Sequence, residues 1–417
     1  MIEEIIAEVE RAGTHFNAVT AVTDWRAKEL ARQSAERLAG GEPRRQLEGR
    51  PFAIKDVIDL AGYPTTMGSA VRSDSAVTTS ALVVSRLEDA GAIPVAKTNC
   101  QEYSYGILGD ESVFGRVINP VDPALCTAGS SSGSAALVAA DAVPLALGTD
   151  TAGSVRVPAA CQGVLGFKPS FGAVPVEGVF PLSPAFDTVG LFAADLGLLS
   201  VAFDVIAGTE AQAQHMEGAA ESGKTIDLSL IGAFAGGDAQ DQVMDRLAAV
   251  PNLAVTSTNG PALVELIDEC APIYDFVRRY EAFEVHRELI AGGADDYQPG
   301  VRAKILFGQD LAGEEYLENL DALARLRTRA VTIFDSADFL LTPAIDGPVI
   351  RWEDIMTDSA AKFMHYSMPF NVLGWPALTI PVAGGIESQE LPESVQLVGP
   401  PGSDRALLSF AAQLCRK

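Results

Sequence analysis

Two serine-rich loops contain the residues best suited to nucleophilic chemistry. Ser130 lies in TAGSSSGS at 127–134, and Ser154 ends the loop GTDTAGS at 148–154. A helix of small residues and a buried strand are predicted between them. A helix followed by an antiparallel or crossing strand could bring the two loops together, so the serines could share one site.

The second loop could form an oxyanion hole. Thr151, Ala152, Gly153 and Ser154 have little side-chain bulk, so consecutive backbone N–H groups could point to one place. Gly153 also permits backbone angles that other residues resist. We expect these N–H groups to stabilise a developing oxyanion.

Lys55 is the candidate base, because neither loop contains a histidine. A serine hydroxyl is a weak nucleophile until a base takes its proton. Lys55 lies between the apolar residues of PFAIKDVI at 51–58, where burial would lower the amine pKa from about 10.4. Ser130 could then relay the proton. Each signal alone is weak, since a Gly/Ser loop is more often a turn with a helix cap.

Composition limits the partners that we expect. The 417 residues carry a net charge of −25, which would repel nucleic acid and anionic membranes. The start MIEEIIAEVERAG is acidic where a signal peptide is basic, so a cytoplasmic location is expected. Histidines and cysteines lack metal-ligand spacing, so we predict neither a metal nor an organic cofactor.

Alternating helix and strand patterns predict an α/β fold with a parallel or mixed sheet. Residues 209–226 are polar and predict an exposed connection. Predicted helices cover most of 1–40 (the second from Trp25 to Leu38), 80–90, 262–291 and 404–415, and predicted strands include one ending near Lys55, 92–98, 143–150, 163–169, 339–344, 377–385 and 394–402.

The serine loops and their surroundings closely resemble the signature segment of the amidase signature family. The segment is AGSSSGSAALVAADAVPLALGTDTAGSVRVPAACQGVLGFKPS at 128–170, and PFAIKDVIDLAG resembles the lysine segment of that family. The likeness runs from about residue 15 to residue 413. It implies one amidase domain over 1–417, with N-terminal helices at 1–40 and a signature core at about 50–200. It also implies a large mixed β-sheet covered on both faces by helices.

The resemblance implies an amidohydrolase that cleaves a carboxamide C–N bond of a small amide or ureido substrate and releases ammonia or an amine. Ser154 would form the acyl-enzyme, and Ser130, after a cis peptide bond from Gly129, would link Ser154 to the base Lys55. The oxyanion hole would consist of the N–H groups of Thr151, Ala152, Gly153 and Ser154. Where the family often has glycine, this chain has Ala128, Ser132, Ala152 and Ser394.

The substrate pocket is less well defined by the sequence. Placement predicts walls from Tyr103, Tyr105, Ile107, the segment 181–187 and Trp375. Four polar residues could bind a charged substrate or form a solvated helix face: Arg278, Tyr280, Glu281 and Arg302. A homodimer is possible, since soluble enzymes are often dimeric.

Three alternatives remain at the level of sequence. Residues 129–133 fit G-x-S-x-G, so Ser131 could be the nucleophile of an α/β-hydrolase-type esterase with a histidine such as His365. A glutaminase subunit of a tRNA-dependent amidotransferase would use the same fold. A non-catalytic protein could bind an anion with its glycine-rich loops, although the chain lacks a phosphate-loop motif and is strongly acidic.

Overall fold

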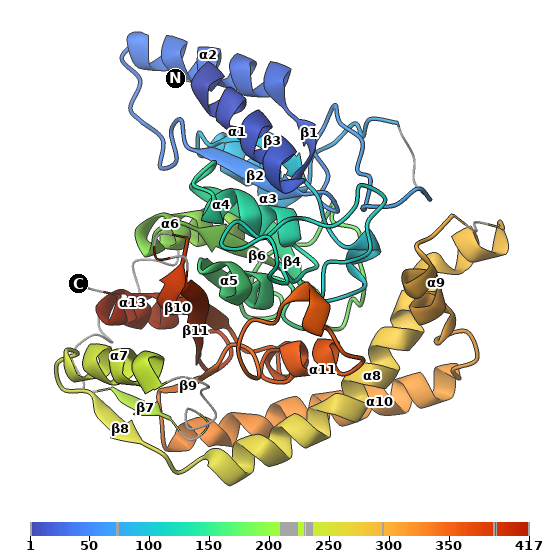
Figure 1. Cartoon of the computed structure of the whole chain (residues 1–417), viewed down its shortest axis with the longest axis vertical. Coiled ribbons are helices and arrows are strands. Elements are labelled where there is room, and N and C mark those ends of the chain that lie inside the picture. The colour runs from blue at the N-terminus through green and yellow to red at the C-terminus, as the bar shows by residue number, and fades with distance from the viewer. Residues whose placement is uncertain are drawn as a thin grey trace.

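Eleven strands form one mixed sheet in the order β1-β3-β2-β4-β6-β5-β10-β11-β9-β7-β8. Figure 1 shows how the helices surround these strands. The computed structural model describes residues 2–71, 75–208, 224–228, 230, 237–293, 296–386, 388 and 390–415. The strands are β1 Val19–Val22, β2 Pro51–Lys55, β3 Ile93–Thr98, β4 Leu145–Asp150, β5 Leu165–Lys168, β6 Thr188–Ala193, β7 Thr225–Asp227, β8 Ala254–Thr256, β9 Phe339–Pro343, β10 Ala377–Gly385 and β11 Glu390–Val398.

Helices cover both faces of this sheet. On one face, α3 and α13 pack against α6, and α7 packs on β10. On the other face, α1 and α4 cover the first strands and α5 packs on β5, β10 and β11, while α8 pairs with α10 and α12. The helices are α1 Ile2–Phe16, α2 Asp24–Ala39, α3 Leu82–Asp89, α4 Ser132–Ala139, α5 Arg156–Gln162, α6 Leu196–Ala207, α7 Gly237–Ala248, α8 Gly260–Ala291, α9 Pro299–Leu306, α10 Gly313–Ala330, α11 Ser359–Met364, α12 Met368–Val372 and α13 Asp404–Leu414.

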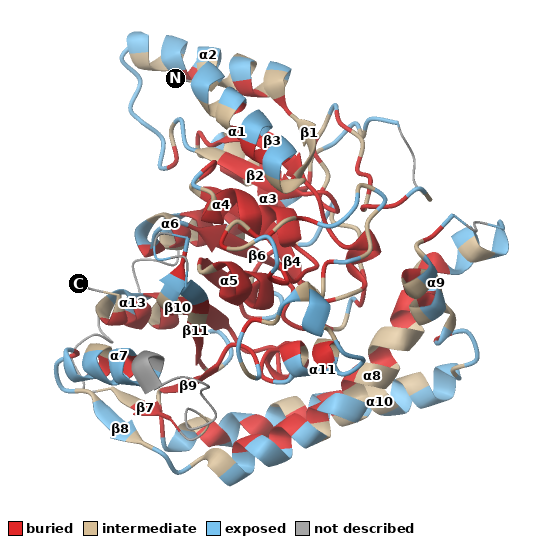
Figure 2. Cartoon of the chain, in the orientation of Figure 1, coloured by how far each residue is buried: buried red, intermediate tan, exposed pale blue. Residues whose placement is uncertain are grey.

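The central helices α4 and α5 are buried along their whole length, as Figure 2 shows. Small side chains make this possible, because the sequence of α4 is SGSAALVA. A Cβ atom on Gly133 would lie 2.3 Å from the carbonyl oxygen of Ala18, so no larger residue fits there without movement. Strands β3, β4 and β6 are buried at every position, as expected for strands covered on both faces.

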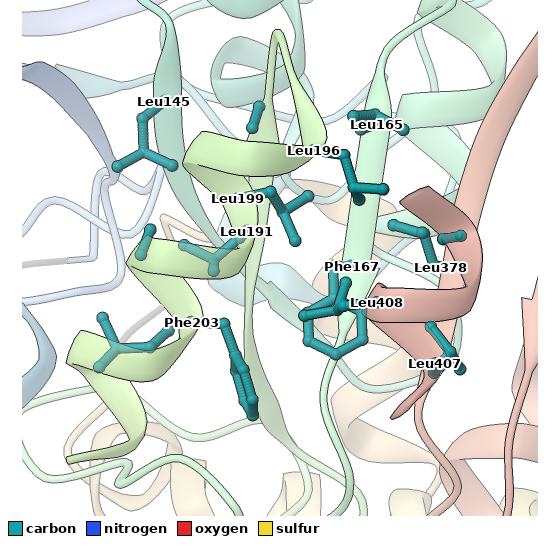
Figure 3. Packing of buried hydrophobic residues seen from close by; sticks show 14 of the residues in the cluster. Leu145, Leu165, Phe167, Leu191, Leu196, Leu199, Phe203, Leu378, Leu407 and Leu408 are labelled. Carbon is teal, nitrogen blue, oxygen red and sulfur yellow. The ribbon is translucent and has the colours of Figure 1, made fainter. Parts of the chain in front are cut away.

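An apolar layer joins α6 and α13 to the sheet (Figure 3). Leu199 and Phe203 of α6 belong to the same buried cluster as Leu191 of β6 and Phe167 of β5. The rings of Phe167 and Phe203 meet edge to face with centroids 5.3 Å apart. Leu145 and Leu147 of β4, the strand that leads into the loop of Ser154, belong to the same cluster.

The fold confirms the predicted class, a large mixed sheet with helices on both faces. The sequence interpretation missed β1, β6 and β8. The predicted connection over 209–226 lies largely outside the described residues, and its last two residues begin β7. In the described part of the chain, no helix has the length and apolar character needed to cross a membrane.

Substitution of Leu199 tests this layer. Leu199→Ala should lower the free energy of unfolding by about 2–5 kcal/mol, because it leaves a cavity under α6. Val201→Ala, on the exposed side of the same helix, should change it by less than about 0.5 kcal/mol. Urea unfolding followed by circular dichroism measures both, and equal effects would contradict the assigned packing.

Candidate active site

The Lys55 amine lies in contact with two hydroxyl groups. Lys55 ends β2 and is fully buried, and its Nζ donates to Ser130 Oγ and to Thr149 Oγ1, each at 2.6 Å. Burial is the main cause that lowers the pKa of Lys55 to about 8. About a tenth of the amine is therefore neutral at pH 7, and neutral amine can accept a proton.

The structure brings the two serine loops into contact. The backbone N–H of Ser131 donates to the carbonyl oxygen of Ser154 at 3.3 Å. The peptide bond from Gly129 to Ser130 is cis, as the resemblance implied. Ser130 precedes α4, β4 returns antiparallel to β6, and Ser154 lies between β4 and α5. The helix α4 and the strand β4, which separate the two serines in the sequence, thus bring their loops together in space.

The Ser131 hydroxyl is hydrogen-bonded to the backbone of β4. Its hydroxyl donates to the carbonyl oxygen of Thr149 at 3.2 Å and accepts the N–H of the same residue at 3.3 Å. The side chain is fully buried. His365 lies at the end of α11, and no hydrogen bond within the described residues links it to Ser131. This arrangement contradicts the nucleophile-elbow interpretation.

A buried ion pair fixes the loop that contains Ser154. Asp150 accepts from Arg156 at 2.9 Å, and both side chains are fully buried. Burial opposes ionisation of Asp150, but the charge and hydrogen bonds of Arg156 outweigh it and lower the pKa of the carboxyl. Arg156 also donates to the Ser367 carbonyl and to the Gln396 side chain. The loop is thereby tied to the last third of the chain.

The same carboxylate changes the predicted oxyanion hole. Asp150 accepts the N–H of Gly153 at 2.7 Å, so that donor is already occupied. The N–H groups of Thr151, Ala152 and Ser154 donate no hydrogen bond within the described residues. Gly153 has φ +124°, and a Cβ there would lie 2.2 Å from Ser367 Oγ, so only glycine fits.

A cavity of about 280 Å³ opens at Ser154, and we name it the Ser154 cavity. Of the predicted wall, Tyr105, Ile107 and Leu182 of the segment 181–187 line it. Its described lining is Ser104, Tyr105, Gly106, Ile107, Leu108, Asp110, Thr151, Ala152, Ser154, Leu182, Tyr274, Arg278, Arg279, Lys304, Phe307, Ala360 and Met364.

Two predicted wall residues belong to the core instead. Tyr103 packs among Phe180, His286 and Tyr297. Trp375 is fully buried against Phe334 and Phe370. Neither lines the Ser154 cavity, so placing them in its wall was wrong. Large aromatic side chains near a site often pack in the hydrophobic core and do not line the pocket. Sequence position alone could not distinguish these two kinds of residue.

The other candidate polar residues have separate positions. Arg278 lines the Ser154 cavity. Glu281 is buried, accepts from the Ser183 hydroxyl and holds the segment 181–187 to α8. Tyr280 stacks on Tyr316 outside the cavity lining. Arg302 lies on α9 and does not line the cavity.

A second cavity, of about 440 Å³, adjoins the first at Ser104, Thr151 and Leu182. Its lining is largely apolar, but includes Asp187. Burial raises the pKa of Asp187 to about 6, and Thr151 Oγ1 donates to its carboxylate at 2.6 Å. Asp187 therefore helps to position Thr151, which precedes Ala152.

Sequence reasoning missed Thr149, Asp150, Arg156 and Asp187. Thr149, Asp150 and Arg156 lie in the segment 128–170 quoted for the resemblance, and Asp187 lies in the predicted wall segment 181–187. For Asp150, Arg156 and Asp187, a charged residue inside an otherwise small or apolar segment was the available signal. No cluster of three or more histidine, cysteine, aspartate or glutamate residues suited to a metal lies within the described residues.

Comparison with known proteins identifies the family. The Amidase family model matches residues 1–229 and 272–408. A 2-amino-5-chloromuconic acid deaminase from Comamonas testosteroni is 30% identical over 96% of this chain and 88% of its own length. A glutamyl-tRNA(Gln) amidotransferase subunit from Symbiobacterium thermophilum is 31% identical, with 97% and 90% covered.

A solved structure gives the same result. A crystal structure of an amidase has a TM-score of 0.85 and 30% identity, covering 99% of this chain and 94% of that one. The chain therefore belongs to the amidase signature family. It is an amidase-family hydrolase of C–N bonds, and the α/β-hydrolase alternative is wrong.

Neutralising Asp150 tests the buried ion pair. Asp150→Asn should lower the free energy of unfolding by about 3–5 kcal/mol, because Arg156 keeps a buried charge without its carboxylate. The exposed pair Asp122–Arg351 supplies the control, and Asp122→Asn should cost less than about 1 kcal/mol. Thermal and urea unfolding compare the two, and similar losses would show that the buried pair does not fix this loop.

Proposed function

We propose that the chain hydrolyses a carboxamide bond of a small substrate through an acyl-enzyme on Ser154. The observation that carries this proposal is the 2.6 Å contact between the buried Lys55 amine and Ser130 Oγ, next to the loop of Ser154. Family membership supports the reaction class. The reaction is the addition of water across a C–N bond, which yields a carboxylate and ammonia or an amine.

Proton transfer would begin at Lys55. The neutral amine takes the proton of the Ser130 hydroxyl as Ser130 takes the proton of Ser154, and Ser154 Oγ attacks the amide carbonyl. The relay then runs in reverse, so the nitrogen leaves with a proton. Water, deprotonated along the same path, attacks the acyl-enzyme and releases the acid. Thr149 orients the Lys55 amine through its hydroxyl.

The oxyanion would lie among the N–H groups of Thr151, Ala152 and Ser154. All three N–H groups are free of other acceptors among the described residues, and all three residues line the Ser154 cavity. Donors fixed in advance stabilise the charge that develops on the carbonyl oxygen at little reorganisation cost. Asp150 contributes indirectly, because it holds the Gly153 amide and sets the angle of the loop.

A glutaminase role is the second candidate. It is favoured by relatives named as subunits of glutamyl-tRNA(Gln) amidotransferase, which match nearly the whole chain at 28–31% identity. This role requires preference for glutamine and a second protein that receives ammonia. Glutamine hydrolysis by the isolated chain, and affinity purification from the native host, test it. Slow turnover of glutamine relative to other amides would exclude it.

Four alanine variants test the triad. Ser154→Ala should lower kcat/KM by roughly 10³-fold or more, and Lys55→Ala and Ser130→Ala by roughly 10²–10⁴-fold, because each breaks the proton path. Ser131→Ala should retain most activity, since its hydroxyl binds only backbone. Ammonia release from a panel of small amides measures all four. An inactive Ser131→Ala beside an active Lys55→Ala would overturn the triad.

The pH dependence tests the base. Lys55 must be neutral to accept a proton, and its pKa is lowered to about 8. We therefore expect kcat/KM to rise about tenfold per pH unit below pH 8 and to level off above it. Circular dichroism across the range controls for unfolding. A midpoint near 6 would instead match Asp187, whose pKa is raised to about 6, and would contradict Lys55 as the titrating base.

A further inference from the structure

Positive side chains gather at the Ser154 cavity, although the chain as a whole carries −25 charges. Arg278, Arg279 and Lys304 line the cavity, and Asp110 is the one acidic residue among its described lining. Asp110 is exposed, so solvent and salt screen its charge. The walls therefore favour an anion more than the rest of the surface does.

These cations are incompletely neutralised by the protein. Arg278 pairs with Asp275 at 2.9 Å, and Arg279 pairs with the same half-exposed carboxylate at 3.0 Å. Lys304 has its own partner, Glu111, at 3.1 Å. Within the described residues, neither arginine has a second carboxylate at ion-pair distance, so two guanidinium groups share one negative charge.

Arg278 is the member of this group that the structure fixes best. Its side chain is 16% exposed, against 39% for Arg279. The guanidinium lies 4.9 Å from the ring centre of Tyr274 and 5.3 Å from that of Tyr105. Its Nε has no acceptor among the described residues. A planar guanidinium held between two rings is preorganised to bind a carboxylate, and little side-chain entropy remains to be lost.

We propose that the substrate carries a carboxylate group, which Arg278 binds while Ser154 attacks the amide of the same molecule. The proposal rests on the proposed hydrolysis at Ser154 and names its substrate class. Both residues line one cavity of about 280 Å³, so one small molecule can contact both. Short amido acids and ureido acids have this form, with one amide carbonyl and one carboxylate a few bonds apart.

Binding to the Ser154→Ala variant tests this without turnover. The probes are malonamate, succinamate and glutaramate, each compared by calorimetry with its neutral diamide. We expect at least one acid to bind about tenfold more tightly than its diamide. Adding Arg278→Gln should weaken binding of that acid by about 10- to 100-fold, as for loss of a charged hydrogen bond, and should weaken binding of the diamide much less. Arg278→Lys should give an intermediate affinity for the acid, because lysine keeps the positive charge but lacks the paired N–H donors of the guanidinium group.

Arg287→Gln is the matched control. Arg287 lies on the same helix α8, is exposed, pairs with Glu284 and does not line the cavity. It should leave binding of every probe unchanged. The proposal would be overturned if acid and diamide bound equally in all three pairs, or if none of the probes bound. It would also be overturned if Arg278→Gln and Arg287→Gln had equal effects.

Ammonia release separates this proposal from the proposed function. With Ser154 intact, Arg278→Gln should slow ammonia release from the acid more than from its neutral diamide, Arg287→Gln should release ammonia from both at the wild-type rate, and Ser154→Ala should release none from either. Hydrolysis retained by Ser154→Ala would refute the nucleophile and leave the binding result at Arg278 standing. Hydrolysis that depends on Ser154 but shows no preference for acids would refute carboxylate recognition alone.

Discussion

Burial of the Lys55 amine is the constraint on which the surrounding structure depends. The described residues offer it no carboxylate at ion-pair distance, and its contacts are the hydroxyls of Ser130 and Thr149. A hydroxyl can donate or accept, so either protonation state of the amine can be satisfied. Lys97, on the neighbouring strand, is equally buried but forms an ion pair with Asp56 at 2.8 Å. Two buried lysines on paired strands thus have different surroundings, one suited to exchanging a proton and one to holding a charge.

The second requirement is that loops far apart in sequence keep fixed positions. Arg156 meets it by contacting Asp150 within its own segment and Ser367 and Gln396 more than 200 residues later. A guanidinium group has five donors in a rigid plane, which suits it to join several acceptors at once. Small side chains on α4 and α5 allow the backbones to approach closely enough for these bonds to form. The site can therefore be complete only when the last strands have joined the sheet.

Much of this arrangement could be predicted from the sequence. The serine loops, Lys55 and the mixed sheet follow from local patterns and from the family resemblance. Contacts that depend on three-dimensional packing did not: Asp150 occupies the Gly153 amide, which removes one predicted donor, and Trp375 fills the core. The edge strand β1 has four partly exposed residues between two helices, too short a pattern to distinguish from a turn. The ion pairs could not be predicted from the sequence either, because Asp275 pairs with two arginines one helical turn away, Arg278 and Arg279.

The Ser154 cavity has walls of two different origins. One wall includes the loop between β4 and α5, where Thr151, Ala152 and Ser154 are buried. The opposite wall includes residues of α8 and α9, which pack against each other toward one side of the molecule in Figure 1. Substitutions on α8 and α9 can reshape that wall without disturbing the buried residues around Lys55. In this architecture, substrate preference can therefore change through substitutions in the wall formed by α8 and α9. The buried residues around Lys55 can stay the same.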